Sequence, residues 1–302
     1  NTAKKILDVE GVDIFVPKKK ITVGTRGSKL ALTQTNWIID QLKKVQPDYE
    51  FETKIIRTSG DDGNIDVVGA FTSALQRSML AGEIDIAINK IIEKANAKSA
   101  TIGYRGYKHA SCISLNHVVC HGIPSTKIIK NGDIINIDVT VIVDGWYGDT
   151  SRMYAVGALN RKAERLIKIT HDALFKGIEK VKPGNTFGDI GNAIQTYVEA
   201  NRMSVVKDFC GHGLGTVFHA PPNVLHYGAK GTGPVLEEGM FFTIEPMVNI
   251  GKPETKILSD GWTAVTRDKS LSAQFEHSLG VTADGFEIFT LSPNNKFYPV
   301  IL

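Results

Sequence analysis

Cysteine and long apolar runs are scarce in this sequence, and both absences limit what the protein can be. Its 302 residues include three cysteines, Cys112, Cys120 and Cys210, which lack a Cys-x-x-Cys spacing and are too few for a disulfide framework. No apolar run is long enough to span a bilayer, and the first twenty residues lack the apolar core of a secretory signal peptide. We therefore expect a cytoplasmic protein with no membrane contact.

An excess of charge of either sign is also lacking. The net charge of +3 is too small to indicate a nucleic-acid partner or a membrane surface. Hydrophobic residues make up 42% and charged residues 22% of the chain, which is ordinary for a soluble globular protein. A chain of 302 residues has room for two ordinary domains or one large one.

The first part of the chain has the pattern of a small α/β segment. Strands that alternate with helices are typical of that fold class. Gly82 is the predicted stop of the second helix, ahead of a third apolar run. The patterns predict strands at residues 21–24, 51–57 and 84–88, and helices at residues 28–46 and 70–81.

This segment resembles the amino-terminal part of porphobilinogen deaminase (hydroxymethylbilane synthase). The resemblance covers about residues 21–88 and implies that the stretch around Arg26 and Ser28 binds pyrrole carboxylates. It stops after Ile88, where the family's catalytic His-Ser-x-Lys-Asp segment and its later domains do not follow. We expect no deaminase activity, although a pyrrole-binding module remains an alternative for this segment. The motifs that carry the resemblance are VGTRGSKLAL at 23–32, QTNW at 34–37 and IRTSGD at 56–61.

Residues 134–152 are typical of a β-hairpin. Apolar and polar residues alternate from 135 to 143, and Asp144-Gly145 is a strong signal for a two-residue turn. The register that this turn sets puts Asp138 and Asp149 one diagonal step apart on the same face, with side chains about 7 Å apart or less. Two carboxylates this close favour a cation between them. Two solvated acids on the open face of a surface hairpin remain the alternative.

The rest of the second half mixes helices and strands. The apolar spacing and the flanking turn residues predict two amphipathic helices, and short apolar runs predict strands. Residues 101–109 and 220–235 are predicted as loops. The helices are expected at 160–181 and 186–201, with a short one at 89–96, and the strands at 112–120, 204–207, 240–250, 273–282 and 286–291.

Three further residues have side chains suited to metal binding. His212 stands between two glycines, while Glu245 and Glu276 each stand in an apolar strand, where a carboxylate is costly unless it is paired or ligated. A core salt bridge for Glu245 and a hydrogen-bonded turn histidine for His212 are the alternatives. With Asp138 and Asp149 they make four oxygen ligands and one nitrogen, which suits Mn²⁺, Fe²⁺, Co²⁺ or Zn²⁺ in an open catalytic site better than a structural zinc site.

The same residues stand in motifs that resemble type I methionine aminopeptidase. The resemblance runs from about residue 89 to residue 299 and implies an α+β, pita-bread (creatinase/aminopeptidase) fold. We therefore predict two domains, a small α/β segment at 1–88 and a dimetal aminopeptidase domain at 89–302. The long helix that opens the type I enzymes is missing, and a helix of the first segment is a candidate to cover the sheet in its place. The motifs are NIDVT at 136–140, GDTS at 148–151, CGHGLG at 210–215, FTIEPM at 242–247 and LSAQFEH at 271–277.

The resemblance also implies a role for each site residue. Asp138 is expected to bind one of two metal ions, Asp149 and Glu276 to bridge both, and His212 and Glu245 to bind the other. A metal-bridging water is the expected nucleophile, and Glu245 is expected to move its proton. His219 is expected to hydrogen-bond the scissile carbonyl and His121 the substrate amide nitrogen. The residues that match the methionine pocket are Tyr104, Tyr107, Cys112, His121, Phe218, His219 and Trp262.

The implied function is metal-dependent removal of the initiator methionine from proteins and peptides whose second residue is small. The implied partners are nascent polypeptide N-termini at the ribosome, and the implied state is a monomer with two divalent ions (Co, Mn, Fe or Zn). A prolidase-like pita-bread hydrolase and a non-catalytic pita-bread binding module are the alternatives. All five ligands are present, which argues against the binding module.

Overall fold

The structure, a computed structural model, describes residues 19–25, seven positions between 35 and 44, 49–55, 81–291 and 300–301. The chain divides into two compact units, Asn1–Leu75 and Gln76–Leu302, and each is described by itself. In the described residues, no helix is long and apolar enough to cross a membrane.

The first unit contains a parallel strand pair and helical residues. Strand β1 (Lys19–Thr25) pairs along its whole length with β2 (Tyr49–Ile55), and the described residues from 35 to 44 are helical. Thr35 and Ile39 are both buried, as expected for positions one helical turn apart. The first two predicted strands and the first predicted helix are confirmed at the positions that the structure describes, which are 19–25, 49–55 and the seven helical residues between 35 and 44. The predicted helix at 70–81, except its last residue, and the Arg26–Ser28 stretch lie outside the described residues.

Helix α4 (Ala81–Lys94) opens the described part of the second unit. The sequence predicted a helix stop at Gly82, a strand at 84–88 and a short helix at 89–96. The first two predictions were wrong; the third is confirmed for residues 89–94, which form the last part of α4. Ile84, Ile86 and Ile88 fit a strand, but Ala81, Ile84 and Ile92 also fit one face of a helix, and that face packs on a sheet. Gly82 lies in the first turn, where its N–H donates to the carbonyl of Ser125 at 2.8 Å.

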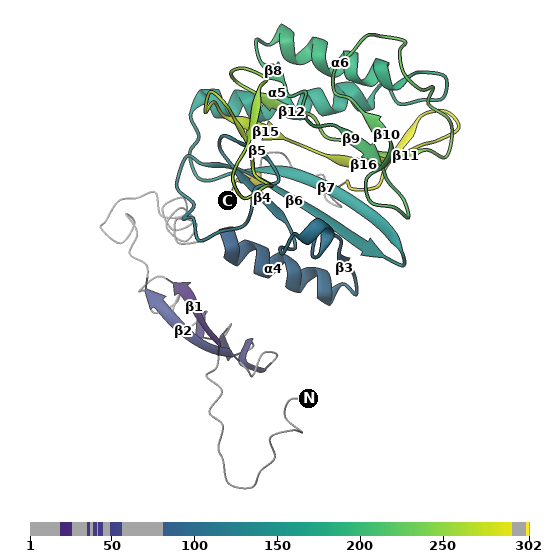
Figure 1. The fold of residues 1–302 in the computed structure, drawn as a ribbon. Coiled ribbons are helices and arrows are strands. Elements are labelled where there is room, and N and C mark those ends of the chain that lie inside the picture. Colours follow the sequence, from purple (N-terminus) through teal and green to yellow (C-terminus); the bar gives the residue numbers. More distant parts are fainter. Residues whose placement is uncertain are drawn as a thin grey trace, which may run out of the picture. The chain divides into compact units, whose positions relative to one another are not determined.

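Two five-stranded sheets form the body of the second unit. One has the order β18-β7-β6-β3, with β4 paired to β6, and the other has the order β10-β9-β11-β16-β17. Figure 1 shows α5 and α6 on the outer side of the second sheet, and α4 on the outer side of the first. The strands of the first sheet are β3 (Lys98–Ser99), β4 (Cys112–Leu115), β6 (Ile134–Val143), β7 (Trp146–Ala155) and β18 (Val300–Ile301). Those of the second are β9 (Gly211–Gly213), β10 (Ala220–Val224), β11 (Phe241–Ile244), β16 (His277–Val281) and β17 (Phe286–Ile288).

Two three-stranded sheets connect these layers, with orders β15-β12-β8 and β13-β14-β5. One 3₁₀ turn, η1 (Tyr104–Gly106), lies in the predicted loop at 101–109. The strands are β5 (Val118–Cys120), β8 (Ser204–Val205), β12 (Met247–Asn249), β13 (Thr255–Ile257), β14 (Ala264–Thr266) and β15 (Ser272–Gln274).

Strands β6 and β7 form the hairpin that the sequence predicted. Asp138 pairs with Ser151 and Thr140 with Asp149, the register that a two-residue turn sets. Asp144 and Gly145 have φ of 50° and 86°, the left-handed conformation that such a turn requires. The predicted positions of Asp138 and Asp149 on the same strand face are therefore confirmed.

Helices α5 (Arg161–Ile178) and α6 (Phe187–Ala200) confirm the two amphipathic helices. Asn160 caps α5 by accepting hydrogen bonds from two backbone N–H groups, and Thr186 and Asp189 form a capping box at the start of α6. The buried faces of both helices pack over β11, β12 and β15 in the main hydrophobic core. This core fixes the second sheet, which carries His212.

Several predicted strands are interrupted where functional residues stand. The runs at 240–250 and 273–282 each break into two strands, so Glu245 and Glu276 lie between strands and not within them. Pro246 has no N–H to donate, which ends β11. The run at 112–120 breaks at Asn116, which has a positive φ. The predicted loop at 220–235 begins with a strand, β10, which pairs with β9. The prolines in this stretch argued against a strand in the sequence, because proline is uncommon within sheets.

Candidate active site

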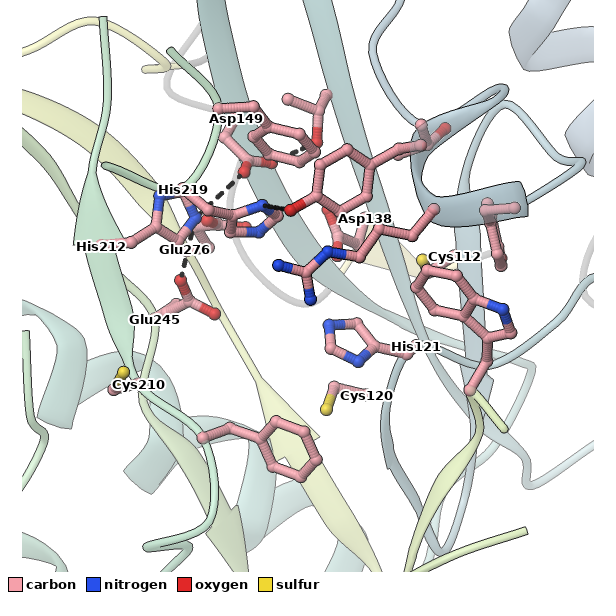
Figure 2. Close-up of a pocket in the computed structure, with 18 of the residues that line it drawn as sticks. Cys112, Cys120, His121, Asp138, Asp149, Cys210, His212, His219, Glu245 and Glu276 are labelled. Atoms are coloured by element: carbon pink, nitrogen blue, oxygen red, sulfur yellow. Dashed lines mark hydrogen bonds and ion pairs between the residues drawn. The ribbon is translucent and has the colours of Figure 1, made fainter. Parts of the chain in front are cut away.

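A cavity of about 350 Å³ lies between the two main sheets. Figure 2 shows two groups of side chains around it. One side has Asp149, His212, His219, Glu245 and Glu276, and the other has Cys112, Cys120 and His121. Every site residue predicted from the sequence lines this cavity. The set comprises Asp138, Asp149, His212, Glu245, Glu276, Tyr104, Tyr107, Cys112, His121, Phe218, His219 and Trp262.

Asp149 is held in place from two strands. Thr140, opposite it on β6, donates its hydroxyl to Asp149 Oδ1 at 2.7 Å. The backbone N–H of Asp149 donates to Ser278 Oγ at 3.0 Å, and Ser278 Oγ donates to the Asp149 carbonyl at 2.6 Å. The hairpin of the first sheet is thereby joined to β16 of the second. These three hydrogen bonds use Oδ1 and the backbone of Asp149. The other carboxylate oxygen, Oδ2, lies 3.6 Å from His212 Nε2.

His212 is oriented by its own strand and by β11. Its backbone N–H donates to Thr243 Oγ1 at 3.1 Å, and its Nδ1 donates to the carbonyl of Gly213 at 3.0 Å. This leaves Nε2 free to bind a metal, at 3.6 Å from Asp149 Oδ2 and 3.7 Å from Glu245 Oε1. Both flanking glycines are needed: a Cβ on Gly213 would stand 2.3 Å from the carbonyl oxygen of Pro221.

Glu245 is held by neutral donors. Thr243 Oγ1 donates to Oε1 at 2.8 Å and Gln274 Nε2 to Oε2 at 3.2 Å, while the backbone N–H of Glu245 donates to His226 Nε2 at 3.0 Å. Burial lowers the pKa of His226 to about 3, so this histidine stays neutral and accepts the bond. The sequence motifs gave no supporting role to Thr140, Thr243 or His226, whose hydrogen bonds to Asp149 and Glu245 the structure shows.

Glu276 and Asp138 complete the acidic side of the cavity. Glu276 is 2% exposed, and its backbone N–H donates to the carbonyl of Ser151 at 3.0 Å. Ligand atoms of Asp149, His212 and Glu276 all lie within 4.8 Å of one another. Asp138 lines the same cavity from β6 but is not part of this closest group of three.

The acids raise one another's pKa values. Burial, followed by the charges of Asp149 and Glu245, raises the pKa of Asp138 well above its ordinary value, and the pKa of Glu276 rises for the same reasons. Burial also raises the pKa of Glu245 to about 7, although His212 opposes the shift. Burial disfavours the protonated form of His212, but Asp149 and Glu245 raise its pKa overall. Without a further cation, this group therefore retains protons near neutral pH.

The donor set fits divalent metal ions. Within the described residues, the ion-pair partner of Asp149 and Glu245 is His212 itself, a potential ligand and not a counter-ion of fixed charge. Buried carboxylates without such a counter-ion are typical of metal sites. Oxygen ligands with one imidazole suit Mn²⁺, Fe²⁺, Co²⁺ or Zn²⁺.

Aromatic side chains wall the remainder of the cavity. Tyr107 lies edge-on to Trp262 with ring centroids 4.9 Å apart, and Tyr104 lies 4.9 Å from Phe218. Tyr104 Oη is also hydrogen-bonded to His219 Nδ1 at 2.9 Å. Eight further residues line the cavity and were not among the predicted site residues: Thr101, Arg105, Cys120, Thr140, Asp208, Phe209, Cys210 and Met247.

The two expected substrate-contacting histidines share an unusual backbone. His121 and His219 have φ of 54° and 60°, a conformation that costs energy for a residue with a Cβ. Burial lowers the pKa of His121, and burial followed by the charge of His212 lowers the pKa of His219 to about 4. Both imidazoles are therefore neutral at pH 7 and able to donate or accept a hydrogen bond.

The chain matches two protein families over overlapping ranges. Residues 65–283 match metallopeptidase family M24, and residues 21–94 match the dipyrromethane cofactor-binding domain of porphobilinogen deaminase. The mosaic that the sequence motifs indicated is therefore confirmed. Helix α4 lies inside both ranges.

Individual relatives give the same result. Methionine aminopeptidase from Rickettsia prowazekii is 57% identical over 230 residues, which are 76% of this chain and 88% of that protein. The enzyme from Escherichia coli K12 is 51% identical over 222 residues, 73% of this chain and 84% of that protein. The solved structure of the Rickettsia prowazekii enzyme has a TM-score of 0.71 at 53% identity, covering 78% of this chain and 99% of that one.

More distant structures show the fold alone. The prolidase from Pyrococcus horikoshii OT3 is 20% identical, with a TM-score of 0.54 over 89% of this chain and 74% of that one. The second unit therefore has the expected pita-bread fold, which aminopeptidases and prolidases share. The higher identity to aminopeptidases separates the two groups. On this evidence the chain belongs to the methionine aminopeptidases of metallopeptidase family M24, and is a divalent-metal hydrolase.

Proposed function

We propose that this protein removes the N-terminal methionine from proteins and peptides whose second residue is small. The observation that carries the proposal is the cavity itself. Three potential metal ligands lie within 4.8 Å of one another on one side, and a wall of aromatic and sulfur-containing side chains lies on the other. A thioether side chain packs well against aromatic rings and sulfur.

We assign five residues to the metal ions. Asp138, Asp149, Glu245 and Glu276 carry four negative charges when ionised, which two divalent ions would neutralise, and His212 would add a nitrogen ligand. Bound ions would supply an activated water and polarise the scissile carbonyl. The candidate ions are Mn²⁺, Fe²⁺, Co²⁺ and Zn²⁺.

The remaining groups act on protons and on substrate orientation. Glu245, which lines the cavity beside His212, is placed to accept a proton and pass it to the leaving amine. A neutral His219, oriented by Tyr104, is placed to hydrogen-bond the carbonyl oxygen of the scissile bond. His121, on the opposite wall beside Trp262, is assigned to the substrate amide nitrogen.

The cellular setting that we propose is the cytoplasm. All three cysteines are free in the structure, which suits a reducing cytoplasm. The substrates would be nascent polypeptide N-termini met at the ribosome, and the enzyme would act as a monomer. Sedimentation analysis of the purified protein would test the oligomeric state.

The test is release of methionine from Met-Gly-Met-Met with Mn²⁺ or Co²⁺, before and after chelation. We expect release that stops with a chelator and returns with metal. Absence of metal-dependent release from the wild-type protein would contradict the proposal. Hydrolysis of a Gly-Pro dipeptide in its place would favour the prolidase alternative.

Asp149→Asn should lower kcat/KM at least about 100-fold, because even residues that only support metal ligands contribute about 10–100-fold. Asp144→Asn is the matched control, since it is the same change at the exposed tip of the same hairpin. Asp144 has a positive φ, which Asn tolerates, so this variant should keep wild-type activity. Full activity of Asp149→Asn would mean that the ligand assignment is wrong.

A further inference from the structure

Asp85 is a buried carboxylate with no part in the proposed chemistry. It lies on α4, the helix on the outer side of the first sheet, and is 7% exposed (Figure 1). All the hydrogen bonds that the structure gives its side chain go to one loop. Ser111 donates its backbone N–H to Oδ1 at 2.9 Å and its hydroxyl to the same oxygen at 2.8 Å, and His109 Nδ1 lies 3.2 Å from Oδ2.

The loop that Asp85 holds forms part of the pocket wall. Tyr107 donates its hydroxyl to the carbonyl of Ser111 at 3.0 Å and is 4% exposed. Burial, together with Cys112, raises the pKa of Tyr107, so the hydroxyl stays protonated and keeps this bond. Ser111 thus accepts from the pocket tyrosine at its carbonyl and donates to Asp85 at its N–H and hydroxyl.

The same loop leads directly into β4, which pairs with the strand that carries Asp138. Cys112 follows Ser111 and pairs with Asp138 where β4 runs beside β6. A shift of Ser111 would therefore move Cys112 and Tyr107, which both line the cavity. Asp85 itself does not line the cavity.

We propose that Asp85 is a positioning residue that sets the shape of the methionine pocket through Ser111. This inference rests on the proposed function, since it assigns the pocket to the methionine side chain. Ser111 is fully buried, so without the carboxylate its N–H and hydroxyl would lose their partner and water would not replace it. The loop would then relax, and the distance between Tyr107 and Trp262 would be free to change.

The position of Asp85 gives the proposal a second consequence. Helix α4 lies where the two family matches overlap, and its inner face packs on the first sheet of the aminopeptidase part. Ala81 and Ile84 pack on Ile113 and Ile135 there, and Asp85 is the polar member of that face. The pocket of this chain therefore depends on residues at the junction between its two parts.

The test compares Asp85→Ala and Ser111→Ala with a control on the same helix, Glu93→Ala, which loses only an exposed hydrogen bond to Asn89. For Met-Gly-Met-Met, we expect Asp85→Ala to raise KM about tenfold while kcat changes less than about threefold, because binding is lost and the metal site is kept. The preference for Met over Leu at the first position should fall. Asp85→Asn keeps an acceptor for Ser111 and should restore most of the KM.

Two further readouts separate the possible failures. Thermal unfolding shows whether Asp85→Ala only destabilises the fold; a lower Tm with unchanged KM and unchanged Met/Leu preference would overturn the inference. Equilibrium dialysis of free L-methionine does not depend on turnover. If the wild-type protein binds methionine but releases none from peptides, the proposed function fails, and weaker binding by Asp85→Ala than by Glu93→Ala still supports the inference. Equal binding by these two variants overturns it.

Discussion

Single residues at the metal side of the cavity are held by neutral hydrogen-bond donors. Thr140 supports Asp149, and Thr243 and Gln274 support Glu245. Neutral donors orient a carboxylate without cancelling its charge, which leaves that charge for a cation. In the absence of metal, burial and the charges of neighbouring acids raise the pKa values of Asp138 and Glu276. Stability and metal binding should therefore both depend on pH.

Glu245 should make a contribution to the stability of the metal-free protein that is lost as the pH rises from about 5 to about 8. The pKa of Glu245 is raised from 4.5 to about 7, so this carboxyl stabilises the fold while it is protonated below pH 4.5, and the contribution is lost as the pH rises through about 7. Divalent metal binds the ionised form, so stabilisation by added Mn²⁺ should grow over the same range. Thermal unfolding with and without Mn²⁺ measures both trends.

Glu245→Gln is the control for this pH dependence. Between about pH 5 and about pH 8, the Tm of the metal-free wild-type protein should fall relative to that of the metal-free variant, because the variant lacks this carboxyl. The same pH dependence of Tm in both proteins would contradict the raised pKa of Glu245.

At the scale of elements, close approach of strands decides where the ligands lie. Strand β9 is Gly-His-Gly and runs between β10 and β11, so its backbone is close to both neighbours. A Cβ on Gly213 would meet the carbonyl oxygen of Pro221, and one on Gly211 would meet the carbonyl oxygen of Thr243. The two glycines are therefore required for His212 to reach the acids from the second sheet.

Gly213→Ala should destabilise the protein by about 1–3 kcal/mol and weaken metal binding at least about tenfold, because the new Cβ would stand 2.3 Å from a backbone oxygen and displace His212. Gly148→Ala is the matched control, because Gly148 directly precedes the proposed ligand Asp149 in β7. A Cβ on Gly148 would meet only a Val141 methyl group, at 3.9 Å. That variant should remain within about 0.5 kcal/mol of wild type. Urea unfolding and Mn²⁺ titration test both; equal behaviour of the two variants would contradict the steric argument.

At the scale of the whole molecule, two family matches overlap at the junction between the two parts. The sequence motifs predicted a boundary at residue 88, whereas the compact second unit begins at Gln76 and the M24 match at residue 65. The boundary at 88 stays a prediction, and it would cut α4 in two. Truncation can distinguish the two positions.

A chain that begins at Gln76 should fold, bind metal and release methionine, because it keeps α4 and its contacts with Ile113, Leu115 and Ile135. A chain that begins at Asn89 should be less stable and have a raised KM, because it exposes those apolar side chains and removes Asp85. Circular dichroism melting and the peptide assay measure both effects. Equal stability and KM for the two truncated chains would support the boundary at residue 88.

The sequence alone determined the local structure and the identity of the ligand types. The hairpin register at Asp144-Gly145, the caps of α5 and α6, and the acid and histidine motifs depend on neighbouring residues, and each could be predicted from spacing. Tertiary structure decided whether Asp138 and Asp149 are solvated surface acids or line a cavity, and whether residues 84–88 form a strand or part of a helix. Only the meeting of two sheets brings His212 and Glu276 to Asp149, and only packing on β4 and β6 makes residues 81–94 a helix when their isoleucines also fit a strand. Such contacts join residues far apart in the chain, so no local pattern records them.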